Sequence, residues 1–293
     1  LKIDLGVRVE GNTITPENRD SVAYIPVSGS ASALWDINDQ HQLSLAFTHT
    51  QRAPQLQELF TDGFHHATRS YERGNANLQK ELSNNLDLGY RFNSDWMTAE
   101  INLFHNWASD YIYQQRSSTL LFDEESGDFV ASDTNCNACF PLLNTQQANA
   151  TFKGFEAQAI FPLMQNNYGA LDLTLFGDYT RGTFDYGADV PRMPPLRYGL
   201  QLSYEKNDWS ANARLTRAEA QTKPGDNETP TDSYLLLNIV GQYKLTDLHG
   251  ADILLFAKGK NLLNENIRNS TSYLRNFAPE PGRGGEIGIR VSY

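Results

Sequence analysis

The chain has 293 residues, of which 40% are hydrophobic and 11% aromatic, and its formal net charge is −11 at pH 7. No apolar run approaches the ~18 residues that a membrane-spanning helix needs, which argues against a helical membrane protein. The acidic balance argues against a nucleic-acid partner, because phosphate binding needs patches of Lys and Arg. The chain opens in a strand-like pattern rather than in a signal peptide, so we expect a fragment or a processed product.

Alternation of apolar and polar residues is the dominant pattern, and it predicts about a dozen strands. Most of these segments are longer than the ~5–6 residues typical of soluble sheets. They suit the ~9–11 residues of a tilted transmembrane strand. In chain order the predicted strands cover residues 1–11, 21–37, 42–50, 85–92, 96–113, 149–161, 170–180, 197–204, 209–216, 233–245, 251–263 and 286–293.

The links between the predicted strands alternate between short and long. The short links are 38–40, 93–95, 162–168, 205–208 and 246–250, and the long links are 12–20, 51–84, 114–148, 181–196, 218–232 and 264–285. Outer-membrane barrels have this rhythm, with tight periplasmic turns and long extracellular loops. A soluble sandwich has no reason to keep it. We therefore predict an all-β fold, an antiparallel transmembrane β-barrel with its long loops extracellular and its C-terminus periplasmic.

Two further features fit a barrel in lipid. Aromatic residues gather near the strand ends, as an interfacial girdle requires, and Tyr293 closes the chain as one of them. Every backbone polar group must pair within the bilayer, so a barrel must close on itself. Either the twelve predicted strands close alone, or they belong to a larger barrel whose first half is missing.

Short motifs mark the strand ends and the long links. In chain order they are Arg52-Ala53-Pro54, Glu58-Leu59-Phe60, Tyr71-Glu72, Gly74-Asn75, Asn77-Leu78, 81–90, Gly154-Phe155-Glu156, 191–197, Asn261-Leu262-Leu263-Asn264 and Pro281-Gly282-Arg283. Together, over essentially the whole chain, they resemble the TonB-dependent receptor family of outer-membrane transporters. The resemblance implies that residues 1–293 form the C-terminal half of a barrel of about 22 strands. The plug domain and the TonB-contacting segment of the family have no counterpart in this chain.

A finer resemblance concerns the cargo. The segments 62–68, 151–163 and 272–283 are similar to the ZnuD-type zinc receptors. The resemblance implies active uptake of a scarce metal nutrient, with zinc as first choice and a ferric siderophore or haem as the alternative. It implies as partners the outer-membrane lipid and lipopolysaccharide, the TonB complex acting through the missing plug region, and a metal or metal-chelate ligand. We expect no resident cofactor.

Three residues of the long link 51–84 are candidate metal ligands, namely Asp62, His65 and His66. Imidazole suits zinc, copper and iron, and a carboxylate suits hard cations. Adjacent residues of an extended segment point in opposite directions, so one histidine can reach the lumen while the other packs. The alternative is a polar pair that only binds its loop neighbours. In the same link, Glu72, Arg73 and Asn75 are predicted to be structural, with Gly74 supplying a positive φ.

The two cysteines, Cys136 and Cys139, lie in the next long link. In an oxidising compartment we predict a disulfide between them. The alternative is a pair of thiolates that binds a soft metal in a reduced state. No nucleophile motif and no phosphate-binding glycine loop is present, so no catalytic residue is predicted. An outer-membrane barrel enzyme and a passive porin remain the alternatives from other classes.

Overall fold

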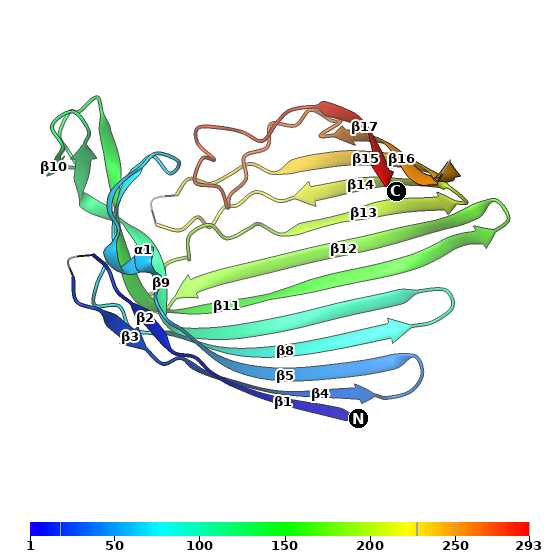
Figure 1. Cartoon of the computed structure of the whole chain (residues 1–293), viewed down its shortest axis with the longest axis horizontal. Coiled ribbons are helices and arrows are strands. Elements are labelled where there is room, and N and C mark those ends of the chain that lie inside the picture. Colours follow the sequence, from blue (N-terminus) through cyan, green and yellow to red (C-terminus); the bar gives the residue numbers. More distant parts are fainter. Residues whose placement is uncertain (18, 227, 249, 293) are drawn as a thin grey trace.

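The computed structural model describes residues 1–17, 19–226, 228–248 and 250–292, so Tyr293, the predicted terminal aromatic, lies outside the described residues. Its main feature is a sheet of fifteen strands (Figure 1). Twelve of these strands follow one another from edge to edge, each antiparallel to its neighbours. No helix among the described residues is long and apolar enough to cross a membrane.

The twelve strands confirm the twelve segments predicted from alternation. They are β1 (Lys2–Val9), β4 (Val27–Asp36), β5 (His41–Arg52), β8 (Glu81–Asn93), β9 (Thr98–Asp123), β11 (Cys139–Asn166), β12 (Gly169–Phe184), β13 (Arg197–Lys206), β14 (Trp209–Ala218), β15 (Tyr234–Leu248), β16 (Ala251–Lys260) and β17 (Gly284–Ser292). Each of these twelve strands pairs with the next one along the chain. The short links are the turns at one end of the sheet, and the long links gather at the other (Figure 1).

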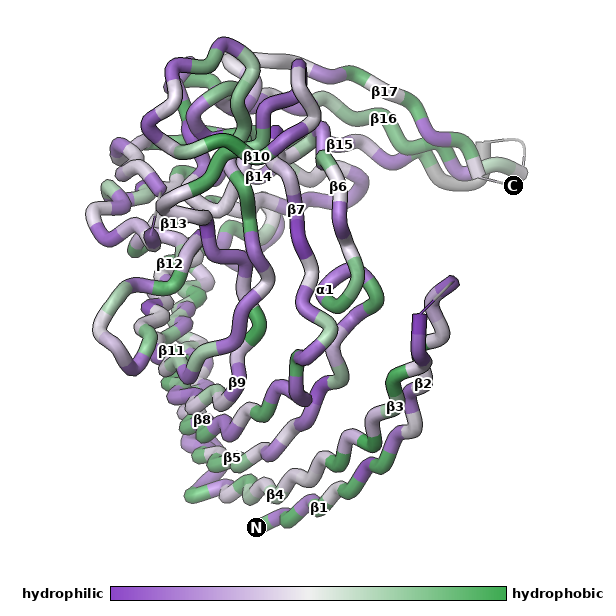
Figure 2. Tube along the Cα trace, turned by 90° about the vertical axis from the view of Figure 1, so that its left-hand side faces the viewer, coloured by the Kyte–Doolittle hydropathy of each residue, from purple (hydrophilic) through white to green (hydrophobic). Residues whose placement is uncertain are grey.

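The sheet curls into an open trough (Figure 2). Strands β1 and β17 are its two edges, and within the described residues they do not pair with each other. The twelve strands therefore do not close into a small barrel, which was one of the two expected outcomes. The open sheet agrees with the other expectation, in which these strands are part of a larger barrel.

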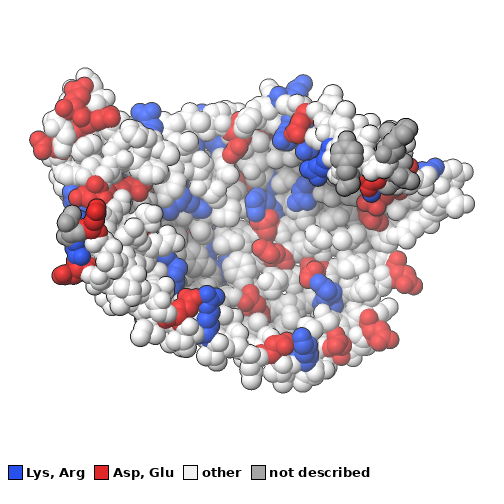
Figure 3. Space-filling view, viewed as in Figure 1, with Lys and Arg blue, Asp and Glu red and all other residues white. Residues whose placement is uncertain are grey.

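The two faces of the trough differ in polarity. Large apolar side chains stand on the convex face, where Leu45 is 49% exposed and Leu103 is 44% exposed. Acidic and basic side chains lie in the hollow (Figure 3). Exposure of so many large apolar side chains on one face is typical of a surface that meets lipid or another apolar partner.

Glycines and phenylalanines lie opposite each other on the concave face. At each such glycine, an added Cβ would come within 2.2–2.8 Å of the facing ring. Each ring therefore lies over the bare backbone of its partner, an arrangement that fixes strand register. The cross-strand pairs are Phe104 with Gly154, Phe152 with Gly182, Phe176 with Gly199, and Phe256 with Gly288.

The long links contain structure of their own. The first carries β2 (Asn12–Ile14), which pairs with β3 (Val22–Tyr24). The predicted strand 21–37 is therefore wrong at its start, because the structure divides it into β3 and β4. The link 51–84 carries α1 (Leu56–Phe60), β6 (Asp62–His65) and β7 (Ser70–Arg73). The third, expected to be an irregular loop over 114–148, is largely strand. There β9 and β11 continue to 26 and 28 residues, and β10 (Asp128–Ala131) pairs with β9. Strand β7 then lies parallel to β11, with Tyr71 opposite Leu142.

The buried apolar core lies at the end of the sheet that carries the long links. One cluster holds Leu59 of α1, Leu78 and Ile112 of β9, and another holds Ala150, Phe184 and Val190. Over the rest of the described sheet, one face is apolar and outward and the other is polar. The core therefore stabilises the arrangement of the links.

Candidate functional site

An arginine ties the long link 51–84 to the wall. Arg52, the last residue of β5, contacts Glu58 of α1 and Glu81 of β8, each at 2.9 Å. Glu81 also accepts a hydrogen bond from the backbone of Ile112 at 3.0 Å. The Arg-Ala-Pro and Glu-Leu-Phe motifs thus have a structural role, because Arg52 and Glu58 hold α1 against β8.

The turn around Gly74 packs directly on α1. Gly74 donates its backbone N–H to Thr61 at 2.7 Å, and Asn75 donates to Glu58 at 2.9 Å. Gly74 is not among the residues of positive φ, so the predicted reason for this glycine is wrong. An added Cβ would lie 2.6 Å from the carbonyl carbon of Leu59. Glycine is needed here for the close approach of two backbones.

His65 is at the end of β6 and is exposed. Its Nδ1 lies 3.0 Å from Oγ1 of Thr68 and 3.8 Å from a carboxylate oxygen of Glu72. Thr68 also donates to Glu72 at 3.0 Å. The imidazole therefore belongs to a small polar group, with one carboxylate close enough to share a cation with it.

Asp62 and His66 have other neighbours. Asp62 accepts a hydrogen bond from the hydroxyl of Tyr71 at 3.0 Å, and His66 packs edge-on against Phe64 at a centroid distance of 4.8 Å. Within the described residues, Asp62, His65 and His66 do not form a group whose ligand atoms all lie within 4.8 Å of one another. A metal-binding role for these three residues stays a prediction.

Cys136 and Cys139 form a disulfide in the structure. Together with Asp123 they are the only three potential ligand residues, over the described part of the chain, whose atoms cluster within 4.8 Å. Both sulfurs are used in the disulfide, so this group has no thiolate to offer. The neighbouring acidic residues lie at an exposed tip beside β10, where Figure 3 shows them gathered.

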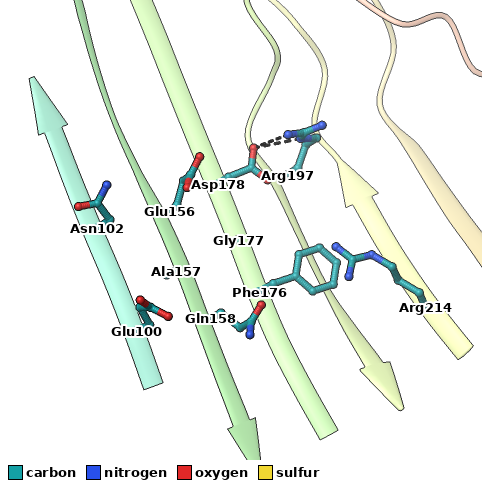
Figure 4. A pocket seen from close by; sticks show the side chains of 10 residues that line it. All are labelled: Glu100, Asn102, Glu156, Ala157, Gln158, Phe176, Gly177, Asp178, Arg197 and Arg214. Carbon is teal, nitrogen blue, oxygen red and sulfur yellow. Dashed lines mark hydrogen bonds and ion pairs between the residues drawn. The ribbon is translucent and has the colours of Figure 1, made fainter. Parts of the chain in front are cut away.

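A first cavity, of about 580 Å³, lies on the concave wall (Figure 4). Arg197 of β13 pairs with Asp178 of β12 at 2.8 Å. The guanidinium of Arg214 lies 3.6 Å from the ring centroid of Phe176. Glu100 and Glu156 face these groups from β9 and β11 (Figure 4). The wall is thus polar and charged, as the alternation predicted.

A second cavity, of about 360 Å³, lies among the long links. Its walls hold four arginines, two acidic residues and three aromatic rings, and they come from five links that are far apart in the sequence. These residues are Arg69, Arg116, Arg192, Arg275, Asp226, Glu228, Phe140, Tyr273 and Phe277. Sequence reasoning missed this cavity. The available signal was the presence of these arginines in the long links of an acidic chain.

Aromatic rings hold two of these guanidinium groups in place. Arg192 lies 4.3 Å from the ring centroid of Tyr273, and Arg69 lies 5.0 Å from that of Phe277. The hydroxyl of Tyr273 donates to Gln114 at 2.9 Å. Burial raises the pKa of Tyr273, and the nearby charge of Arg192 opposes this rise. The cavity therefore presents cations and a protonated phenol.

Arg275 is the most deeply buried of the four arginines. Its side chain is 6% exposed and pairs through Nη2 with Oε1 of Glu228. The other oxygen of Glu228 accepts hydrogen bonds from the backbone N–H groups of Arg192 at 2.9 Å and Gly225 at 3.1 Å. Nη1 of Arg275 is buried and has no hydrogen-bond partner among the described residues.

Known proteins resemble this chain in sequence pattern and in fold. Residues 1–262 match the family model described as TonB dependent receptor-like, beta-barrel. The solved copper transporter OprC superposes with a TM-score of 0.76 at 18% identity, over 99% of this chain and 44% of that one. The FrpB iron transporter of Neisseria meningitidis gives a TM-score of 0.66 at 13% identity, over 98% of this chain and 42% of that one.

A third solved structure gives the same result. A mutant of the ferric enterobactin receptor PfeA of Pseudomonas aeruginosa, in a complex with enterobactin, has a TM-score of 0.61 at 18% identity, over 91% of this chain and 40% of that one. The chain thus spans less than half the length of the solved structures that it matches. The family model covers most of the chain, and the superposed structures share its curved antiparallel sheet. The chain belongs to the TonB-dependent receptor-like β-barrel family.

Proposed function

We propose that this chain forms the C-terminal part of the barrel of a TonB-dependent transporter, which imports a metal ion or a metal chelate across the bacterial outer membrane. The observation that carries the proposal is the family barrel wall itself, with an apolar convex face, a charged concave face and a cavity among its long links. Solved structures of similar fold are named as copper, iron and ferric enterobactin proteins, which supports a metal-containing cargo. In this proposal the long links are extracellular.

The proposal includes energy coupling by TonB, which we infer from the family. Uptake should require TonB and the proton-motive force, because a family plug would close the lumen to free diffusion. The test is uptake of radiolabelled metal or chelate into cells with and without TonB. Uptake that persists without TonB would favour a passive porin. The family is one of receptors rather than enzymes, so no catalytic step is proposed.

Zinc is the candidate cargo favoured by the sequence, and one observation speaks for it. His65 lies 3.8 Å from Glu72, so an imidazole and a carboxylate are available at an exposed position. Replacing both His65 and His66 with alanine should then weaken zinc binding by the full-length protein. The matched control is His41→Ala, because His41 lies near a short link at the other end of β5 and bonds Tyr90. Equal zinc affinity in the unchanged protein, the double alanine variant and His41→Ala would exclude this role.

A metal chelate is the other candidate cargo. The second cavity is large enough for part of a small molecule, and its walls carry several hydrogen-bond donors and aromatic rings. Competition between radiolabelled zinc and ferric chelates in cell uptake separates the two cargoes. If the cargo is a ferric chelate, we expect excess zinc to leave the uptake of radiolabelled ferric chelate unchanged.

A further inference from the structure

We propose that three residues on the outside of the sheet, His105, Lys153 and Arg181, form a binding site for a phosphate group of a membrane lipid. We call these three residues the outer row. The inference goes beyond the proposed function, because it concerns the lipid-facing wall rather than the cargo. It takes from that function only the placement of the sheet in the membrane. The lipid belongs to the leaflet on the side of the long links.

The outer row lies on the convex face of the sheet. Asn102, Glu156 and Asp178 line the cavity on the concave face, where they lie opposite one another across β9, β11 and β12 (Figure 4). Each residue of the outer row is three positions along the same strand from one of these three residues. Successive side chains of a strand point to opposite faces. A separation of three positions therefore puts the outer row on the other face.

Strand pairing brings the outer row together. Lys153 of β11 lies opposite His105 of β9 on one side and opposite Arg181 of β12 on the other. Directly opposite residues of an antiparallel pair have their Cβ atoms ~4.5–5.5 Å apart, so the three side chains are neighbours. Two of them are cations, and like charges directly opposite each other destabilise a sheet. The pairing thus places positive charges where only an anion would relieve their repulsion.

A carboxylate neutralises only part of this charge. Asp189 lies 3.1 Å from Arg181. Lys153 is exposed, and among the described residues its ammonium group has no ion pair and no hydrogen-bond partner. The chain as a whole carries a net charge of −11, and the carboxylates of Glu100, Glu156 and Asp178 face the concave side. The outer row is therefore a positive position on the outside of an acidic protein.

The outer row also lies at the edge of the apolar band. On β12, Leu171 and Arg181 share the convex face and are about ten residues apart, or ~33 Å along the strand. At a strand tilt of ~40° this corresponds to ~25 Å across the membrane, the height of the apolar band of an outer-membrane barrel. The exposed Trp107, whose ring lies 4.2 Å from that of His105, suits the same interface. The outer row is thus level with lipid headgroups.

A phosphate attached to a lipid fits this position better than a free phosphate ion. Ammonium and guanidinium groups donate charge-assisted hydrogen bonds to phosphate oxygens, and a histidine ring adds an N–H donor. The acyl chains of the same lipid would lie along the apolar side chains next to the outer row, such as Leu103 and Leu175, which are 44% and 42% exposed. A free ion makes only the first of these contacts. The site therefore calls for both parts of a phosphorylated lipid.

Microscale thermophoresis of the full-length protein in a neutral detergent tests the site. The probes are a synthetic hexa-acylated glucosamine disaccharide lipid with two phosphates, the same lipid without phosphates, and inorganic phosphate alone. We expect the phosphorylated lipid to bind at least about tenfold more tightly than the unphosphorylated lipid. Its affinity should fall as salt rises, because added ions screen the charges of the outer row.

Variants assign the effect to the outer row. Lys153→Gln and Arg181→Gln should each weaken binding of the phosphorylated lipid about tenfold and leave binding of the unphosphorylated lipid unchanged. The matched control is Lys206→Gln, because Lys206 lies at the short-link end of β13, 6.0 Å from the ring centroid of Tyr168. This control should change neither affinity.

Thermal unfolding gives a second measurement of the same charges. Without lipid, Lys153→Gln should be as stable as the unchanged protein or slightly more stable, because the repulsion between Lys153 and Arg181 is removed. The phosphorylated lipid should raise the unfolding midpoint of the unchanged protein more than that of Lys153→Gln. An equal rise in both proteins would contradict a role for Lys153.

The outcomes separate the lipid site from the transport function. Equal affinity for the two lipids, or an affinity for the phosphorylated lipid that Lys153→Gln leaves unchanged, would overturn the site. Inorganic phosphate that binds through Lys153 as tightly as the phosphorylated lipid would overturn the lipid as occupant. Lys153→Gln decides the question if Arg181→Gln does not fold, because Lys153 is exposed. Uptake of metal or chelate without TonB, with phosphate-dependent lipid binding retained, would overturn only the proposed transport.

Discussion

Gly154→Ala should loosen the sheet between β9, β11 and β12. The added Cβ would lie 1.9 Å from the carbonyl oxygen of Tyr179 and 2.6 Å from the ring of Phe104. Both distances are far below van der Waals contact. The ring of Phe104 must leave its place over Gly154, and the backbone of β12 must move as well, because Tyr179 contributes a backbone atom.

The magnitude follows from two opposing effects. Forcing an extra methyl group into a packed position costs roughly 1–3 kcal/mol. Alanine is favoured over glycine inside a strand by roughly 0.5–1 kcal/mol, because glycine loses more backbone freedom on folding. We therefore expect a net loss of about 1–2 kcal/mol in the free energy of unfolding.

Gly241→Ala is the matched control, since Gly241 lies within β15 and an added Cβ there meets nothing within 4 Å. This variant should be neutral or slightly stabilised. The assay is urea unfolding of the full-length protein in detergent, followed by tryptophan fluorescence and by gel mobility without boiling. If Gly154→Ala is as stable as Gly241→Ala, the ring and the glycine opposite it do not fix this part of the sheet.

Three further outcomes are expected at the end that carries the long links. Leu59→Ala removes a side chain that is 1% exposed, so the link 51–84 should lose roughly 2–5 kcal/mol of local stability, measured by hydrogen exchange. Reduction of the Cys136–Cys139 disulfide should speed proteolysis near β10 without moving the unfolding midpoint of the sheet, because among the described strands β10 pairs with β9 alone. A lowered midpoint would contradict this. The raised pKa of Tyr273 means that this tyrosine loses its proton at lower pH in the unfolded chain than in the folded one, so stability should fall above about pH 10. Other tyrosines with a raised pKa contribute to the same fall, so Tyr273→Phe should reduce it without abolishing it in a pH series of unfolding curves.

The strands could be predicted from the sequence because lipid and water impose opposite demands on neighbouring residues. Leu43, Leu45 and Phe47 alternate with Ser44 and Ala46 for this reason. The extensions of β9 and β11 past residues 113 and 149 could not be predicted in the same way. They are held by each other and by β7 and β10, rather than by a lipid-facing side, so their polarity carries little alternation.

The candidate site was harder to predict than the wall. His65 and His66 were predicted as metal ligands partly because they are adjacent in the sequence. In the structure they have separate neighbours, since His65 contacts Thr68 and His66 packs against Phe64. The cavity of arginines is assembled from segments between Thr68 and Phe277, and no local spacing joins them. The role of Gly74 could not be predicted from the sequence either. This glycine allows its backbone to approach the backbone of Leu59, and the two residues come together only in the folded chain.

The length of β9 and β11 sets how far the cavity among the long links lies from the lipid. A strand of 28 residues is ~90 Å long at ~3.3 Å per residue, and a tilted crossing of the bilayer uses only about 9–11 residues. Much of each strand therefore stands beyond the hydrocarbon layer as a paired ladder, which register shifts interrupt at Pro141/Leu143 and Ala148/Ala150. The paired strands therefore hold the cavity at a fixed distance from the membrane. Lengthening both strands by two residues would move the cavity by ~7 Å and keep the inner face inward, whereas a single added residue needs a β-bulge such as those already present in β11.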